Sequence, residues 1–255
     1  MLTGTADLSS LVARLAPPTI PAWDHEPVEL RGVDCLQLVA ELRRPAREVT
    51  LPRGLHPTEP PALIIQAWKV DESVWGPFSI CFTRLSCRSG VRARGFTTAC
   101  VSDNDVAGDQ LATRWGFPNR EGGVRLRTHY DACELEVTVD GRPILTIAGI
   151  DPQALSTGSL QYTASLNLAE TPNGLRLVQV EAAHDAERVQ RVGGRITSFD
   201  AASWGDNRLE PYHVVATTLA RDRTVRLAPI RFACLPEISA FEGTEVIETN
   251  RGNHE

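Results

Sequence analysis

The sequence predicts a mainly β protein (α+β), built as an antiparallel barrel or sandwich with a few short helices. Segments with strand character recur at intervals of roughly 8 to 12 residues along the chain. Helical segments are few, and turn residues separate the strands. No internal repeat, low-complexity tract or linker divides the chain. We therefore expect a single β-rich domain over residues 26–249, preceded by an arm at 1–25 and followed by a polar tail at 250–255.

The composition is typical of a globular protein, with 42% hydrophobic and 23% charged residues. A net charge of −6 argues against a nucleic acid or a membrane surface as partner. No apolar run approaches the roughly 20 residues of a membrane-spanning helix. The N-terminal residues also lack the basic and apolar regions of a secretory signal. We therefore expect a cytoplasmic protein.

The cysteines are scattered through strand-like segments. No two form a C-x-x-C pair, and no histidine lies at metal-ligand spacing from any of them. This pattern predicts free, buried thiols, and we expect neither a metal nor another cofactor. The six residues are Cys35, Cys81, Cys87, Cys100, Cys133 and Cys234.

The first expected element is a short amphipathic helix at 8–15, which ends before Pro17 and Pro18. Its apolar face suits an arm that packs on the body or on a neighbouring subunit. A loosely held leader is an equally good interpretation. The basic stretch 43–50 is a candidate for one helical turn.

Apolar and alternating segments predict the strands. They are expected at 35–42, 62–70, 78–85, 92–101, 124–130, 133–139, 143–148, 158–168, 175–182, 188–192, 194–199, 212–220, 223–228 and 232–234. Asp140 and Gly141 predict a tight hairpin, and residues 172–174 a second turn. His184 and Asp185 fall between two expected strands and are assigned to a turn.

A helix followed by a turn occupies the middle of the chain. Residues 103–105 (DND) can cap a helix that runs to about Thr113. Gly116 and Pro118 end that helix inside the turn 115–120 (WGFPNR). The glycines at 122 and 123 then open a strand.

This turn resembles the active-site segment of the acetoacetate decarboxylase family, in which a helix leads into an aromatic-Pro-Lys-Lys turn. Further similar stretches follow in the family's order at 55–65 (LHPTEPPALII), 73–78 (SVWGPF), 194–199 (GRITSF) and 209–215 (LEPYHVV). The likeness extends from about residue 28 to 236. It implies a closed, cone-like β-barrel around a central pocket, in subunits that form homo-oligomers.

The chemistry implied by the family does not transfer to these residues. In the family, the first lysine has a lowered pKa and forms a Schiff base with the substrate. The resemblance places Asn119 at that lysine and Arg120 at the next one. It places Gln66 and Ile80 at the family's two glutamates and Arg31 at its arginine. An amide forms no imine and an arginine keeps its proton, so we expect no Schiff-base decarboxylation.

Lys69 is the only lysine in the sequence. It follows Gln66 by three residues, so strand alternation sends it to the opposite face. We therefore expect Lys69 at the surface.

The resemblance implies a pocket in which Gln66, Asn119 and Arg120 orient or polarise the substrate. The expected substrate-binding residues are Arg31, Trp75, Phe78, Ile80, Trp115 and Phe117. Amide and guanidinium donors can stabilise an enolate without covalent chemistry, and an aromatic wall suits a hydrophobic carbonyl compound. The tryptophans equally fit a packed core, and Asn119 equally fits a turn residue.

Histidines offer further acid–base candidates. They are His129 beside Tyr130 and Asp131, His213 near Glu210, and His184. A single histidine is more often structural or exposed than catalytic. No Gly-x-Ser-x-Gly, P-loop or dinucleotide-binding motif is present.

The leading hypothesis is a non-decarboxylating enzyme of natural-product biosynthesis. It would cyclise, isomerise or dehydrate a hydrophobic, polyketide-like carbonyl intermediate inside the barrel. A catalytically inactive protein that binds a small ligand is the second hypothesis. A decarboxylase or lyase that works without lysine is the third.

Overall fold

The computed structural model describes residues 2–23, 26–43, 46 and 50–247. The expected tail at 250–255 and most of the expected helical turn at 43–50 lie outside the described residues. The described helices are α1 (Leu8–Leu15), α3 (Asp105–Trp115), the 3-10 helix η1 (Thr157–Ser159) and α4 (Ala240–Gly243). The strands are β1 (Val28–Leu42), β2 (His56–Pro57), β3 (Ala62–Glu72), β4 (Phe78–Ser89), β5 (Arg92–Ser102), β6 (Asn119–Glu121), β7 (Gly123–Thr128), β8 (Ala132–Val139), β9 (Arg142–Leu155), β10 (Ser165–Thr171), β11 (Gly174–Val180), β12 (Ala182–Phe199), β13 (Pro211–Leu227), β14 (Phe232–Cys234) and β15 (Thr244–Val246).

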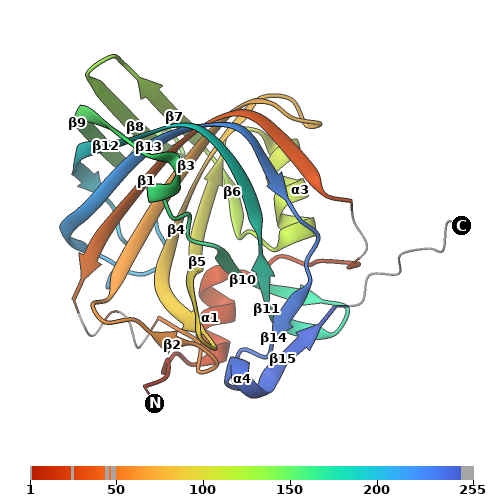
Figure 1. Ribbon diagram of the computed structural model, residues 1–255. Helices are drawn as coiled ribbons and strands as arrows, with labels where there is room; N and C mark the ends of the chain where they lie inside the picture. The colour runs from red at the N-terminus through yellow and green to blue at the C-terminus, as the bar shows by residue number, and fades with distance from the viewer. Residues whose placement is uncertain (1, 24–25, 44–45, 47–49, 248–255) are drawn as a thin grey trace, which may run out of the picture.

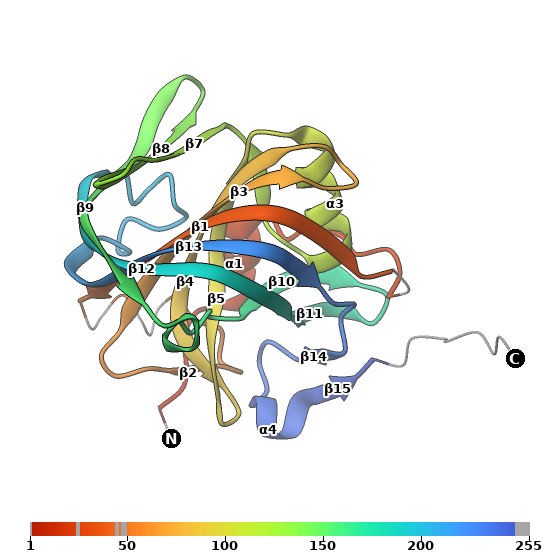
Figure 2. The ribbon, with the colours of Figure 1, turned by 45° about the horizontal axis from the view of Figure 1, so that its top comes forward.

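The strands form one large, strongly curved sheet (Figures 1 and 2). Its order is β15-β14-β11-β10-β5-β4-β3-β1-β13-β12-β9-β8-β7, with β2 beside β4 and β6 beside β5. The mainly β prediction is confirmed. Closure into a barrel stays a prediction, because the hydrogen-bonded path of the described strands ends at β15 and β7 without joining them.

The sheet is mixed, whereas the sequence predicted an antiparallel one. Both β6 and β10 run parallel to β5. Between β5 and β6 the chain passes through α3, and a crossover of this kind is how parallel strands are connected. The other pairings along the path are antiparallel, and the predicted hairpin between β8 and β9 is among them. Its two turn residues, Asp140 and Gly141, have φ values of 52° and 72°, as a tight I′-type hairpin requires.

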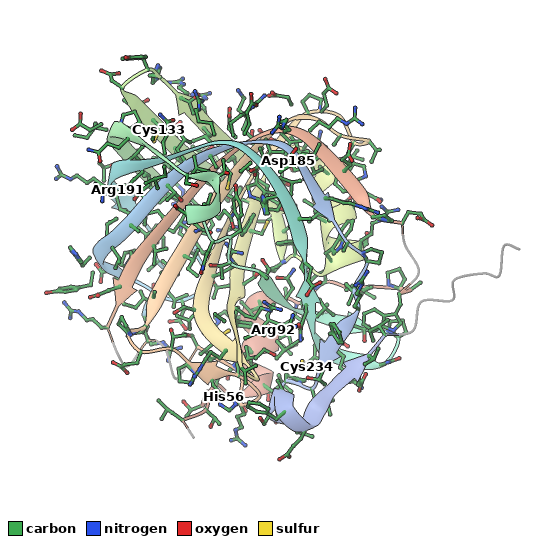
Figure 3. All side chains as sticks on the ribbon, viewed as in Figure 1. His56, Arg92, Cys133, Asp185, Arg191 and Cys234 are labelled. Carbon is green, nitrogen blue, oxygen red and sulfur yellow. The ribbon has the colours of Figure 1, made fainter. Side chains whose placement is uncertain are left out.

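Apolar side chains pack on both faces of the sheet, because neighbouring residues of a strand point to opposite faces. On β3, Leu63 and Ile65 belong to a first core, which also includes α1. Trp68 and Val70 of the same strand belong to a second core, against which α3 packs. Figure 3 shows side chains filling the interior of the curved sheet. The candidate site described below lies in the second core.

The N-terminal helix is packed on the body of the protein. Asp7 caps it by accepting a hydrogen bond from the backbone N–H of Ser10 at 2.9 Å. Leu11 and Leu15 are buried in the first core, and Arg14 forms an ion pair with Asp206. Of the two interpretations that the sequence left open, the structure supports a packed arm.

Two long strands, β12 and β13, replace four shorter predicted ones. They pair from Ala182 and Leu227 to Arg191 and Thr218. Register shifts near Asp185 and Ala186 absorb the polar residues that looked like a turn. His184 therefore lies in a strand, and its assignment to a turn was wrong.

The six cysteines are free and buried, as predicted. Figure 3 shows Cys133 and Cys234 far apart, at different ends of the sheet. Within the described part of the chain, no helix is long and apolar enough to cross a membrane.

Candidate functional site

The structure distributes the predicted site residues over several places. Gln66 and Phe117 line a small cavity in the second core. Asn119 and Arg120 line a different cleft. Arg31 lies on the surface, where its Nε donates to Glu29 Oε1 at 2.8 Å. The predicted single pocket is therefore not assembled from these residues, and their catalytic and binding roles stay predictions.

The remaining predicted residues pack together in the second core. Phe78, Ile80 and Trp115 are buried, and Trp75 is partly buried against them. The ring centroids of Trp75 and Trp115 are 6.3 Å apart, and Trp115 Nε1 donates to the carbonyl of Ala228 at 2.8 Å. This is the packed-core alternative that the sequence left open for the tryptophans.

The cavity in the second core has a volume of about 40 Å³. Its polar lining includes Gln66 on β3, Arg84 on β4, His184 on β12, and Tyr162 in the segment before β10, with Thr163 and Ser165 beside them. Trp68 and Phe117 supply aromatic walls. A water molecule occupies roughly 30 Å³ in the liquid, so this space admits only the reacting end of a larger molecule.

Arg84 is a cation held inside the second core. Its side chain is fully buried, and its guanidinium donates to Gln66 Oε1, to the carbonyl of Thr163 and, at 3.2 Å, to Ser165 Oγ. Burial lowers the pKa of Arg84 to about 9, so the group keeps its charge at neutral pH. Gln66 is fixed in turn, because its Nε2 donates to Cys35 Sγ at 3.2 Å. The arrangement holds a guanidinium and an amide at one wall of the cavity.

His184 is held at another wall by a buried carboxylate. Its Nδ1 lies 2.8 Å from Asp222 Oδ2, and the Asp222 side chain has no exposed surface. The hydroxyl of Tyr162 donates to Asp222 Oδ1 at 2.7 Å. Burial raises the pKa of Tyr162, with Cys35 and Asp222 adding to the effect, so the phenol remains a neutral donor.

This geometry fixes the orientation of the His184 ring. With the proton on Nδ1 donated to Asp222, Nε2 is left with a lone pair that can accept a proton. The ring stacks on Tyr162 with centroids 3.5 Å apart and an interplanar angle of 7°. Trp68 meets it edge-on at 6.0 Å. An aspartate–histidine pair of this kind is an acid–base unit.

The strand ladder brings these groups together from distant parts of the sequence. Asp222 lies on β13 opposite Val33 of β1 and Ala186 of β12. The first register shift of β12 lies between Asp185 and Ala186, close to His184. A bulge commonly re-aims a side chain next to a functional site, and here the histidine and the aspartate meet across neighbouring strands.

The cleft of Asn119 and Arg120 has a volume of about 350 Å³ and is also lined by Arg14 and Ser203. Arg120 donates to the carbonyl of Ser203, and burial lowers the pKa of its guanidinium. The amide of Asn119 packs against Gly108 of α3, where an added Cβ would lie 2.1 Å from Asn119 Nδ2. Helix α3 and the turn after it therefore position these two residues outside the buried cavity.

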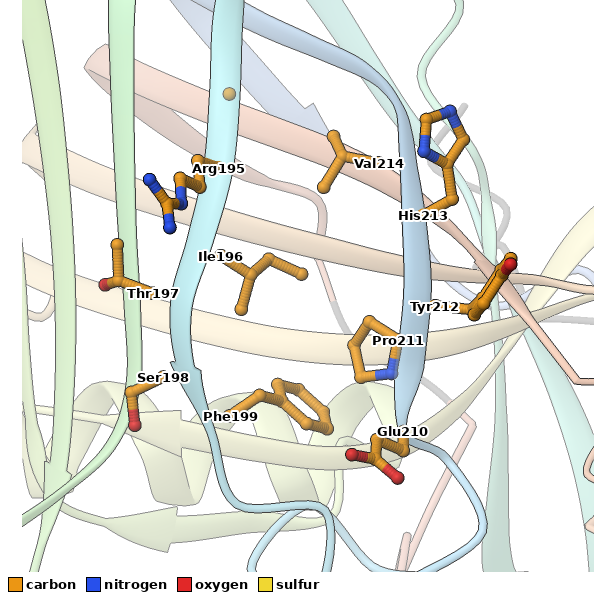
Figure 4. Close-up of a pocket in the computed structure, with 11 residues that line it drawn as sticks. Arg195, Ile196, Thr197, Ser198, Phe199, Glu210, Pro211, Tyr212, His213 and Val214 are labelled. Atoms are coloured by element: carbon orange, nitrogen blue, oxygen red, sulfur yellow. The ribbon is translucent and has the colours of Figure 1, made fainter.

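A larger groove, of about 550 Å³, opens where β12 and β13 separate beyond Arg191 and Thr218. Figure 4 shows Ile196 and Phe199 between the two strands, whereas His213 projects on the far side of β13. His213 and Glu210 are exposed. His129 and Tyr130 are exposed in the turn after β7. Of the three candidate histidines, His184 is the one that lines the buried cavity.

Sequence analysis missed Arg84, Tyr162 and Asp222. The strand 78–85 carried a signal for Arg84, because alternation places it on the same face as the buried Phe78, Ile80 and Phe82. Asp222 fell in the gap between the expected strands 212–220 and 223–228. Tyr162 lies in a segment without helix or strand, and we find no sequence signal for its position.

Lys69 is exposed on β3 while Gln66 is buried, which confirms the predicted opposite orientation. In the described residues, no group of three or more histidine, cysteine or acidic side chains is arranged to hold a metal ion.

No family model matches the sequence, and no curated protein matches it. Solved structures do share its fold. An acetoacetate decarboxylase from Legionella pneumophila is 13% identical with a TM-score of 0.70, the match covering 89% of each chain. An acetoacetate decarboxylase-like enzyme from Sphingomonas wittichii is 13% identical with a TM-score of 0.64, covering 89% of this chain and 97% of that one.

A third similar structure is the enduracididine biosynthesis enzyme MppR, complexed with the condensation product of pyruvate and imidazole 4-carboxaldehyde. It is 16% identical with a TM-score of 0.65, and the match covers 82% of this chain and 90% of that one. These similarities confirm the acetoacetate decarboxylase-like fold that the sequence predicted.

Proposed function

We propose that the protein is a cofactor-independent enzyme that moves protons on a hydrophobic carbonyl compound, and so isomerises, cyclises or dehydrates it without losing CO2. The observation that carries the proposal is the buried Asp222–His184 pair, whose histidine lines the same cavity as Arg84 and Gln66. One pair is an acid–base unit and the other a set of donors for a developing oxyanion.

The proposed first step is the formation of an enolate. Nε2 of His184 takes a proton from the carbon next to the substrate carbonyl, and the electrons of that C–H bond form a C=C bond as the oxygen gains the charge. N–H groups of Arg84 and Gln66 stabilise the oxygen. Asp222 stabilises the imidazolium formed on His184.

Each product class follows from the second step. Return of the proton to a different carbon gives an isomer. Departure of a β-hydroxyl, protonated by His184, gives an alkene and water. Attack of the enolate carbon on a second carbonyl of the same molecule gives a ring, and His184 then protonates the new alkoxide. In all three routes the proton that was removed is returned, so no oxidant or reductant is needed.

The amine chemistry of the decarboxylases is poorly supported here. Lys69 is exposed on the far face of β3 from the cavity, and Asn119 carries an amide. MppR, which shares the fold, was crystallised with pyruvate and with a pyruvate condensation product. Pyruvate is a carbonyl compound, so the fold is compatible with a carbonyl ligand. We also propose that the sheet closes into a barrel, that the subunits form a homo-oligomer, and that the protein is cytoplasmic.

The substrate is to be found by adding the purified protein to an extract of the source strain that lacks its gene, in D2O. Mass spectrometry and NMR then follow the metabolites. The expected result is an isomer or a dehydrated product that carries deuterium at the exchanged carbon. Release of CO2 would favour a lysine-independent decarboxylase. A compound that stays bound but unchanged would favour a ligand-binding protein.

Site variants decide which residues act. His184→Gln should lower turnover on the order of 10²–10⁴-fold, because the base is lost. The matched control is His213→Gln, an exposed histidine on β13, which should keep full activity. If Asn119→Ala or Arg120→Ala removes turnover while His184→Gln does not, the reaction takes place in the other cleft and our assignment is wrong.

A further inference from the structure

A second cavity adjoins the buried one. It measures about 480 Å³ and shares Ala164 and Ala182 with the lining of the buried cavity. Its walls come from the starts of β5 and β12, the end of β13, and the segment that follows β13. We call this space the basic vestibule. Because the shared residues are alanines, only small side chains stand where the two spaces meet.

The vestibule is positively charged within an acidic protein. Among the residues that the structure describes, four arginines line it, together with a single acidic residue, Glu181. They are Arg92, Arg94, Arg226 and Arg231. The lining thus has an excess of three positive charges, although the whole chain has a net charge of −6.

Glu181 compensates the positive charge of these arginines only in part. Its Oε1 lies 4.0 Å from Arg92 Nη1 and 3.7 Å from Arg94 Nη2, which are long distances for ion pairs. Arg226 and Arg231 are exposed and form no ion pair with any described residue. The Arg94 side chain is only 11% exposed, and its buried Nε has no hydrogen-bond partner among the described residues.

We propose that the basic vestibule binds a phosphate or diphosphate group carried on the tail of the substrate. The inference rests on the proposed function, because it names what lies at the other end of the molecule whose carbonyl reacts beside His184. Guanidinium groups match phosphate oxygens with paired hydrogen bonds. A diphosphate also supplies several negative charges, whereas a single carboxylate would leave most of the excess uncompensated.

The sizes of the two spaces agree with this division. The buried cavity of about 40 Å³ accepts a reacting group, and the vestibule of about 480 Å³ has room for a diphosphate and part of its linker. Binding energy from a remote, non-reacting part of a substrate can orient the reacting part. The tail would therefore contribute to turnover as well as to affinity.

The test is calorimetric titration of the full-length protein with inorganic pyrophosphate, with coenzyme A and with hexanoate. We expect pyrophosphate and coenzyme A to bind and to compete for one site. The double variant Arg226→Gln/Arg231→Gln should weaken both by at least about tenfold, since charge-assisted hydrogen bonds are lost. Arg195→Gln, an exposed arginine in the groove between β12 and β13, is the matched control and should change nothing.

The outcomes separate this inference from the proposed function. His184→Gln should bind pyrophosphate as the wild type does, because the vestibule is intact. Hexanoate binding tighter than pyrophosphate would assign a carboxylate to the vestibule and overturn the phosphate proposal. Binding of pyrophosphate that is unaffected by the double variant, or no binding at all, would also overturn it. Full activity of His184→Gln would overturn the proposed chemistry and leave the phosphate site standing.

Discussion

The carboxylate of Asp222, which has no exposed surface, orients the ring of His184. Asp222 accepts one hydrogen bond from Tyr162 and faces His184 Nδ1 at 2.8 Å, so both of its oxygens have partners. A buried charge is retained only with such partners. Arg84, which lines the same cavity as His184, carries a positive charge. The acid–base unit is thus held by groups that are themselves fixed by hydrogen bonds.

The substitution Asp222→Asn tests this dependence. The side chain keeps its size, but its N–H₂ group facing His184 would force the proton onto Nε2, which could then no longer accept one. We expect turnover to fall on the order of 10³–10⁴-fold, measured on the substrate identified from the extract. Asp185→Asn, at the exposed neighbour of His184, should leave turnover unchanged. Full activity of Asp222→Asn would show that the pair plays no part in catalysis.

At the scale of single residues, sequence analysis succeeded where alternation alone decides the outcome. Gln66 is buried and Lys69 is exposed, as the period of a strand requires. The cavity was not predictable, because it depends on contacts between residues far apart in the chain. Tyr162 and Asp222 are separated by 60 residues, and no local pattern links them.

Among the elements, the small strand β15 is attached to β11 through side chains. Arg176 on β11 donates to Glu245 Oε1 from Nε at 3.1 Å and from Nη2 at 2.9 Å. These hydrogen bonds lower the pKa of Glu245 below its ordinary value of 4.5, partly opposed by burial. Strands β14 and β15 pair with each other over three residues only, so we expect this ion pair to matter for their docking.

A pH dependence of stability follows. Because the folded pKa of Glu245 is lowered, its contribution is fully present above its ordinary value and is lost as the pH falls through the folded pKa. Glu245→Gln should therefore cost about 0.5–1 kcal/mol at neutral pH and less at pH 3. Urea unfolding of both proteins at the two pH values measures this difference. If the difference in unfolding free energy were as large at pH 3 as at neutral pH, the ion pair of Glu245 would not be its cause.

The elements that the sequence predicted well are those with local stop and start signals. Helix α3 begins after Asn104, which accepts from the N–H of Ala107 at 3.0 Å, and it ends at Gly116 with a φ of 69°. The long strands β12 and β13 were broken in two by the prediction. Polar residues such as Asp185 and Asp222 resemble turns locally, and only pairing with neighbouring strands keeps the backbone extended.

For the whole molecule, the distribution of cysteines gives a direct test of how tightly the two cores are packed. All six thiols are buried, and burial raises the pKa of Cys35 and of Cys87 to about 12. A thiolate is the reactive form. We expect almost no reaction with a disulfide reagent such as DTNB in the native protein, even at mildly alkaline pH, and six thiols per chain after denaturation. Rapid native labelling would reveal local opening of the sheet.

The overall fold was predictable although each local sequence signal is weak, because the signals extend over most of the chain. Short motifs in the right order indicated one mainly β domain. They gave no information on the two separate cavities. Gln66 lines the buried one, whereas Asn119, whose amide packs against Gly108 of α3, lines the other cleft.

The proposed transfer of a proton from the substrate to His184 leaves the net charge of the buried cavity unchanged. When the histidine takes up a proton from the substrate, an imidazolium and an enolate appear together, so the total charge inside the sheet does not change. No counter-ion has to enter or leave during the step. A neutral carbonyl group can therefore react in a space with room for little more than a single water molecule.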